Sequence, residues 1–259
     1  MDEDAAAMIG RLLDATLPAI ETLDAMARHV APDTLETLAG RVDTAPLAAA
    51  LAAAGAFAWP DRLAPLRDCL TDAATEAQVA LSGFMRAPDD ANPMLAAGRA
   101  LRHRARAEAA LYPLAAFLPP VGRHFLEPAA RGDAALLARL AAVPPGRDGT
   151  GVMHLGGPPG TRGGCALYVP ETYDPARPPP LVVALHGGSG NGADFLWTWL
   201  RVARSRGLLL GAPTSPGRTW TLDDPGADGE VIERILADVE ARWPVDPGRR
   251  LLTGMSDGG

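Results

Sequence analysis

The first half of the chain carries apolar residues at helical spacing. Over residues 4–30 they recur every three or four positions, which places them on one face of an α-helix, and Pro18 predicts a kink or a split within it. Further helices are expected where proline, glycine or a capping residue bounds an apolar segment. Asp33 and Asp133 are predicted caps, and Pro119-Pro120 is predicted to end a helix. We therefore expect an all-helical accessory domain over residues 1–145, with helices near 4–30, 33–38, 46–54, 61–85, 93–117 and 133–142.

The pattern changes near residue 145, where glycines and prolines become frequent. Short β-type apolar runs then alternate with amphipathic stretches, which is typical of an α/β fold. The first two runs are predicted to pair antiparallel at one edge, and the others to join a mostly parallel sheet through right-handed crossovers. Asp194 is the expected cap of the first crossover helix. Residues 146–259 thus form the second predicted domain, with strands at 151–155, 165–170, 181–185, 208–212 and 250–253, and helices at 194–206 and 229–243.

Charge and composition narrow the classes of partner. The formal net charge is −7 and the sequence pI is about 5.2, which disfavours a nucleic-acid or anionic-membrane surface. The N-terminus is acidic where a signal peptide is basic, and no apolar run reaches the roughly 18 residues of a membrane span. A cytoplasmic protein without a membrane span is expected.

The cysteines, the histidines and the basic run of the helical half are not expected to form a catalytic or metal site. The two cysteines, Cys69 and Cys165, are expected to be small buried hydrophobic residues. His29, His103 and His124 lack metal-ligand spacing. Neither a metal nor a cofactor is expected. The basic run 102–106 is interpreted as a solvated helix face rather than an anion site. The helical half is expected to be a packed accessory domain, with a cap, docking or oligomerisation role as the alternative.

The chemistry concentrates at the C-terminal end. Gly254-Met255-Ser256-Asp257-Gly258 fits G-x-S-x-G and follows the apolar run 250–253, a predicted buried strand. This pattern needs small residues at both ends because the serine sits on a sharp turn, where flanking side chains would collide with backbone. Ser256 is the candidate nucleophile; the alternative is a glycine-rich turn with a solvated serine.

A second block precedes Ser256 by about 70 residues. The apolar run 181–185 ends in His186-Gly187-Gly188-Ser189-Gly190-Asn191-Gly192, a strand-to-loop junction that can offer backbone N–H groups to an oxyanion. With both blocks in this order, residues 148–259 resemble the α/β-hydrolase superfamily, in particular its carboxylesterase, phospholipase and polyhydroxybutyrate-depolymerase-like esterases.

The resemblance implies a serine ester hydrolase that forms an acyl-enzyme on Ser256 and acts on a small-molecule ester. The amides of Asp257 and of Gly188 or Ser189 would form the oxyanion hole. In this group His186 would structure the loop rather than act as the base, and His154, on a predicted edge strand, is not expected to act as one. Three tryptophans near the loops, Trp197, Trp199 and Trp220, are interpreted as core residues, with a pocket as the alternative.

The sequence departs from the superfamily after the serine, because the catalytic acid and histidine normally follow it. Only Asp257, Gly258 and Gly259 follow Ser256 here. We therefore expect the first half of a hydrolase, without appreciable esterase activity, in which the strand at 250–253 is an edge with Leu251 or Leu252 exposed. A non-catalytic helical interaction or scaffold protein, and a peptidase or thioesterase on the same fold, are the alternatives.

Overall fold

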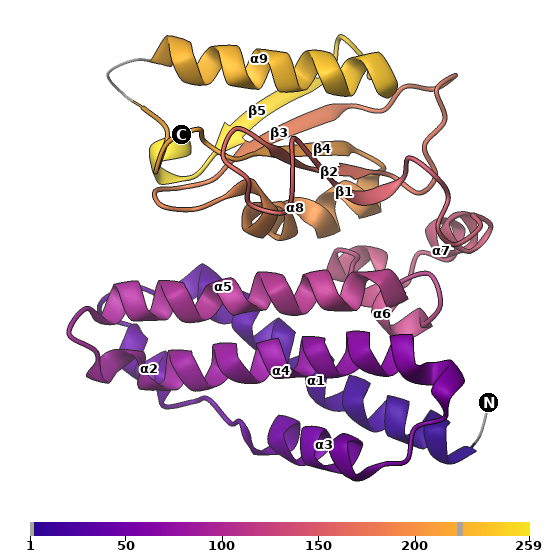
Figure 1. The fold of residues 1–259 in the computed structure, drawn as a ribbon, viewed down its shortest axis with the longest axis vertical. Coiled ribbons are helices and arrows are strands. Elements are labelled where there is room, and N and C mark those ends of the chain that lie inside the picture. The colour runs from indigo at the N-terminus through magenta and orange to yellow at the C-terminus, as the bar shows by residue number, and fades with distance from the viewer. Residues whose placement is uncertain (1–2, 222–224) are drawn as a thin grey trace. The chain divides into compact units, whose positions relative to one another are not determined.

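The structure, a computed structural model, describes residues 3–221 and 225–259 and divides by contacts into two compact units, residues 1–124 and 125–259. The predicted domain boundary at 145/146 stays a prediction. The first unit is helical, and α4 packs along both α5 and α1 (Figure 1). Its helices are α1 (Glu3–His29), α2 (Leu35–Ala39), α3 (Ala45–Ala56), α4 (Ala64–Arg86), α5 (Pro93–Leu111) and α6 (Pro119–His124).

Alanine and glycine bring α4 and α5 close together. A Cβ placed on Gly83 of α4 would lie 3.0 Å from the Cβ of Ala100 on α5. Small residues fill most of the buried positions of both helices, so their backbones approach closely. The buried alanines are Ala73, Ala74, Ala77 and Ala80 on α4, and Ala97, Ala100, Ala105 and Ala107 on α5.

The structure differs from the predictions at three places in the helical region. Helix α1 continues through Pro18, so the predicted split does not occur, while the alternative, a kink, stays a prediction. The N-cap position of α2 is Thr34 rather than Asp33. Pro119-Pro120 begins α6, since the first turn of a helix has no intrahelical partner for the N–H that proline lacks.

The basic run 102–106 is only partly a solvated face. Arg104 is buried, forms an ion pair with Asp24 of α1, and lies 3.3 Å from the Glu108 carboxylate one turn along α5. His103 lies 2.6 Å from the Glu76 carboxylate of α4. Arg104 therefore joins two helices through buried charge, a role that the sequence pattern did not indicate.

The second unit contains a mixed five-stranded sheet with the order β1-β2-β4-β3-β5. The β1–β2 and β2–β4 pairs are antiparallel, whereas β3 pairs parallel with both β4 and β5. The antiparallel edge pair was predicted, but parallel pairing is confined to the other half of the sheet. The strands are β1 (Gly151–Leu155), β2 (Cys165–Val169), β3 (Leu181–Leu185), β4 (Leu209–Pro213) and β5 (Arg250–Gly254); the helices are α7 (Ala134–Ala141), α8 (Gly192–Arg206) and α9 (Pro225–Arg242).

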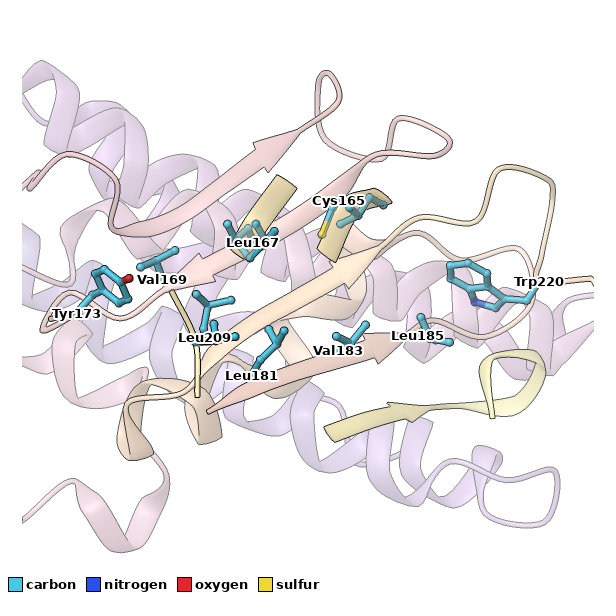
Figure 2. Close-up of a cluster of buried hydrophobic side chains, with 12 residues drawn as sticks. Cys165, Leu167, Val169, Tyr173, Leu181, Val183, Leu185, Leu209 and Trp220 are labelled. Atoms are coloured by element: carbon cyan, nitrogen blue, oxygen red, sulfur yellow. The ribbon is translucent and has the colours of Figure 1, made fainter. Parts of the chain in front are cut away.

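Helices α8 and α9 lie on opposite faces of this sheet (Figure 1). Side chains of a strand alternate between faces, so Leu181, Val183 and Leu185 of β3 point to the same face (Figure 2). They belong to one core cluster with Ile235 and Val239 of α9. All five residues of β2, of β3 and of β4 are buried, which explains their continuous apolar runs.

Strand β5 forms the edge of the sheet next to β3. Leu251 and Leu252 are 49% and 62% exposed, which confirms the predicted exposure. The strand itself is well defined by five residue pairs with β3, from Leu181 opposite Arg250 to Leu185 opposite Gly254. This register places the residues that follow the two strands at the same end of the sheet.

An ion pair between the partly buried Glu171, just after β2, and the buried Arg204 joins this segment to α8. The Arg204 Nε lies 2.9 Å from Glu171 Oε1, and the Tyr168 hydroxyl donates a 2.7 Å hydrogen bond to Oε2. Burial by itself would raise the pKa of Glu171, but the charge of Arg204 and the hydrogen bonds from Tyr168 and Arg204 lower it overall.

Replacing Glu171 with glutamine should lower the free energy of unfolding by about 3 kcal/mol at pH 7, because it removes the carboxylate charge that faces the buried Arg204 guanidinium. The native pKa of Glu171 lies below its ordinary value of 4.5, so the stabilisation is present above that pH and is lost as pH falls through the folded-state pKa. Urea unfolding at pH 7 and at pH 3.5 should therefore show a smaller difference between the two proteins at the lower pH. Arg177→Ala, which breaks an exposed pair with Asp174, is the control and should change stability far less.

Candidate active site

Ser256 follows β5 directly and occupies an unusual backbone conformation. Its φ is 53°, in the left-handed region that side chains other than glycine rarely adopt. In the described part of the chain, the only other non-glycine residue with positive φ is Ser189, at 57°, in the loop after β3. Strained backbone of this kind concentrates at functional sites, and here both instances fall in the two sequence blocks that predicted one.

The glycines on either side of the turn are required by packing. A Cβ on Gly254 would overlap the carbonyl oxygen of Gly258. A Cβ on Gly258 would lie 2.7 Å from the carbonyl oxygens of both Leu185 and His186, closer than real Cβ atoms approach. The turn after β5 therefore closes tightly on itself and against the end of β3, which is the physical reason for glycine at these positions.

The loop after β3 lies directly against the Ser256 turn. The Met255 amide donates a 3.2 Å hydrogen bond to the Leu185 carbonyl. A Cβ on Gly187 would lie 3.4 Å from the Cβ of Ser256, and one on Gly188 would lie 2.8 Å from Oδ2 of Asp257. The four predicted site residues lie in two segments, 188–189 and 256–257. The structure brings these segments together, although about 70 residues separate them in sequence.

His186 is buried beneath this loop, and both of its ring nitrogens are occupied. The Ser215 amide donates a 3.0 Å hydrogen bond to Nε2, so the proton resides on Nδ1, which donates to the Gly187 carbonyl at 2.7 Å. The ring also lies 5.1 Å from that of Trp220, whose indole N–H donates to the His186 carbonyl. These contacts fix the position of the His186 ring next to the loop.

Asp257 connects the serine to a third loop. The Ser256 hydroxyl donates a 3.1 Å hydrogen bond to Asp257 Oδ1, and the Thr219 hydroxyl donates a 2.7 Å hydrogen bond to Oδ2. The hydrogen bonds from Thr219 and then from Ser256 lower the pKa of Asp257. The carboxylate is exposed, and it is therefore ionised and accessible at neutral pH.

The start of α8 fixes the other end of the glycine loop. Asn191 is the N-cap and accepts a 2.8 Å hydrogen bond from the Asp194 amide, while its own side-chain N–H donates to the Asp194 carboxylate. The predicted cap, Asp194, is therefore the third residue of the helix rather than its N-cap. A Cβ on Gly192 would overlap the Ala212 carbonyl, so α8 begins against the end of β4.

The loops after β3, β4 and β5 all lie at the end of the sheet where these three parallel strands have their carboxyl ends. Strands β4 and β5 lie on opposite sides of β3, so the connections that lead to them run in opposite directions across the sheet. Open α/β sheets bind ligands at such a point, outside the carboxyl ends of the strands. Sequence reasoning missed Thr219 in the loop after β4. Its position just beyond a parallel strand, together with the same rule, is the signal that could have found it.

Three of the remaining candidates are buried, whereas Cys69 and Trp199 are half-buried. Burial raises the pKa of the Cys165 thiol to about 12, which suits a buried hydrophobic residue, whereas Cys69 is only half-buried. Trp197 and Trp220 are buried, Trp197 against Phe125 and Trp220 in the core on the α9 face (Figure 2).

Within residues 3–221 and 225–259, no cluster of three metal-binding side chains occurs. None of the described helices is both long and apolar enough to cross a membrane.

Two curated proteins resemble part of this chain. It is 33% identical over 100 residues to feruloyl esterase C of Emericella nidulans and 29% identical over 100 residues to a probable feruloyl esterase C of Aspergillus flavus. Each match covers 36% of this chain and 37% of the relative, so the chain spans just over a third of the length of the relatives it matches. No protein-family model and no solved structure matches the chain. The partial similarity supports a hydrolase of the esterase type.

Replacing Gly254 with alanine should destabilise the second unit by about 2 kcal/mol, because the new methyl group collides with the Gly258 carbonyl and forces the turn open. Gly229→Ala on α9 is the matched control: nothing lies within 4 Å of its Cβ position, and alanine is the better helix former. Urea unfolding measures both. Equal stability of the two variants would contradict the tight packing of this turn.

Proposed function

We propose that this protein is a serine carboxylic-ester hydrolase whose nucleophile is Ser256. The observation that carries the proposal is the left-handed backbone of Ser256 at the carboxyl end of β5, packed against a glycine loop whose Ser189 has the same unusual conformation. A sharp turn of this kind presents the serine hydroxyl beyond the edge of the sheet, where an ester can reach it. Ser256 is exposed, as a nucleophile for an external substrate must be.

The proposed reaction has two acyl transfers. Ser256 Oγ bonds to the carbonyl carbon of the ester while its proton passes to a base; the tetrahedral intermediate then expels the alcohol, which takes up a proton. Water attacks the acyl-serine in the same way, and the carboxylic acid leaves with Ser256 regenerated. Both steps place negative charge on the former carbonyl oxygen.

The amides of Asp257 and of Gly188 or Ser189 are the proposed donors to that oxygen. The amide after the nucleophile and an amide from the loop after β3 can converge because Gly188 lies in contact with Asp257. In the described part of the chain, the Gly188 amide donates no hydrogen bond to another protein group, so it is available for a ligand. A donor of this kind contributes about 10²- to 10³-fold in rate.

Acylation by this 259-residue chain is proposed to be slow. The group that accepts the Ser256 hydrogen bond is the Asp257 carboxylate, whose lowered pKa makes it a poor acceptor of a serine proton. His186 cannot replace it, because Nε2 already accepts the Ser215 amide and Nδ1 donates to Gly187. A fast reaction requires a base of higher pKa beside Ser256.

The substrate is proposed to be a small-molecule ester. The names of the two partial relatives make feruloyl esters, such as methyl ferulate, the first substrates to test. Peptidases and thioesterases use the same geometry, but the similarity to esterases favours an oxygen ester. The helical unit is proposed to act as an accessory or oligomerisation module.

An alkyl fluorophosphonate should modify Ser256: Oγ bonds to phosphorus, fluoride leaves, and the hydroxyl proton passes to the buffer. Trypsin cleaves after Arg250, so mass spectrometry should find the added mass on the fragment 251–259, in which Ser256 is the one serine. Ser256→Ala should abolish this labelling and any slow hydrolysis of methyl ferulate. Ser82→Ala, on α4, is the control and should label as the parent does. Labelling of the parent at another serine, or persistent labelling of Ser256→Ala, contradicts the proposal.

A further inference from the structure

The Asp257 carboxylate occupies the centre of the candidate site. Its two oxygens accept hydrogen bonds from Ser256 and Thr219, and Oδ2 lies against the backbone of Gly188. These contacts come from the loops after β5, β4 and β3 respectively. The carboxylate therefore lies within hydrogen-bond distance of the proposed nucleophile and next to Gly188, whose amide is a proposed oxyanion donor.

Among the described residues, no arginine or histidine forms an ion pair with this carboxylate, and the charge of His186 is the smallest of the causes that lower its pKa. The two ring nitrogens of His186 form hydrogen bonds with the Gly187 carbonyl and the Ser215 amide rather than with Asp257. Arg162, which contacts the same loops, donates to the Gly190 carbonyl at 3.2 Å and to the Ser215 hydroxyl at 3.1 Å. Thr219 and Ser256 solvate the carboxylate without compensating its charge. A full negative charge thus faces any group that approaches Ser256.

We infer that Asp257 determines charge selectivity: the site accepts neutral or cationic esters and disfavours those with a negative charge on the acyl group close to the reacting carbonyl. This inference rests on the proposed function. Two unit charges about 5 Å apart repel weakly in water and several times more strongly near a protein surface. Because Asp257 is exposed, we expect a discrimination of about 5- to 20-fold rather than the larger factors of a buried site. The same charge favours departure of an anionic carboxylic-acid product.

A pair of fluorophosphonates tests this inference. One carries a short alkyl chain that ends in a methyl ester, and the other carries the same chain ending in a free carboxylate. The readout is the ratio of the labelling rates of Ser256, neutral over anionic, measured on fragment 251–259 at about 10 mM ionic strength, where the Debye length is about 30 Å. The ratio cancels changes that affect both probes equally.

Asp257→Asn preserves the size of the side chain and removes its charge, so the ratio should fall about 5- to 20-fold relative to the parent. Thr219→Val removes a hydrogen bond but keeps the charge, and Asp238→Asn removes an exposed charge on α9; both should keep the parent ratio. In the parent, 0.5 M salt should also reduce the ratio, because salt screens exposed charges.

An unchanged ratio in Asp257→Asn overturns the inference and leaves the proposed function intact. Loss of the ratio in Thr219→Val also overturns it, since selectivity would then depend on the geometry of the loops rather than on charge. Failure of both probes to label Ser256 in the parent contradicts the proposed function itself, and the inference with it. Far-UV circular dichroism of each variant confirms that the ratios compare folded proteins.

Discussion

The candidate site depends on one close backbone contact, between the loop after β3 and the turn after β5. Gly258 lies so near the Leu185 and His186 carbonyls that no side chain fits, and Gly254 leaves equally little space on the other side of the turn. This contact holds Ser256 in its left-handed conformation and places Gly188 beside Asp257. The energy for maintaining that strain comes from the surrounding packing, in which β3 is buried along its whole length.

The sheet order makes the contact possible. Helix α8 carries the chain from β3 to β4 on one side, and α9 carries it from β4 to β5 on the other side of β3 (Figure 1). The loops after these three parallel strands consequently converge at the carboxyl end of the strands. There His186 forms a hydrogen bond with the Gly187 carbonyl of the glycine loop, and the Thr219 hydroxyl donates one to Asp257. The exposed Asp257 carboxylate places a negative charge next to Ser256.

Much of the fold could be predicted from local pattern. The runs at 151–155 and 181–185 match β1 and β3, because continuous apolar residues bounded by glycine and proline define short buried strands. Prolines were harder to interpret, since Pro18 lies inside α1 without splitting it and Pro119 begins α6 instead of only following a helix. The pairing of β2 with β4 and the Thr219–Asp257 hydrogen bond depend on tertiary structure, which no local pattern reports. Ser256, Gly188, Ser189 and Asp257 could be proposed from sequence because glycine-rich motifs mark backbone that side chains would block; the roles of these residues remain predictions.

The most direct test of the central claim is a crystal structure of the protein after reaction with a fluorophosphonate. If the edge formed by β3 and β5 is an acyl-transfer site, the phosphorus is bonded to Ser256 Oγ, and a phosphonyl oxygen lies about 2.7–3.1 Å from the Asp257 amide and from the Gly188 or Ser189 amide. A phosphonyl group bonded elsewhere, or one on Ser256 whose oxygens contact neither loop, would contradict the account.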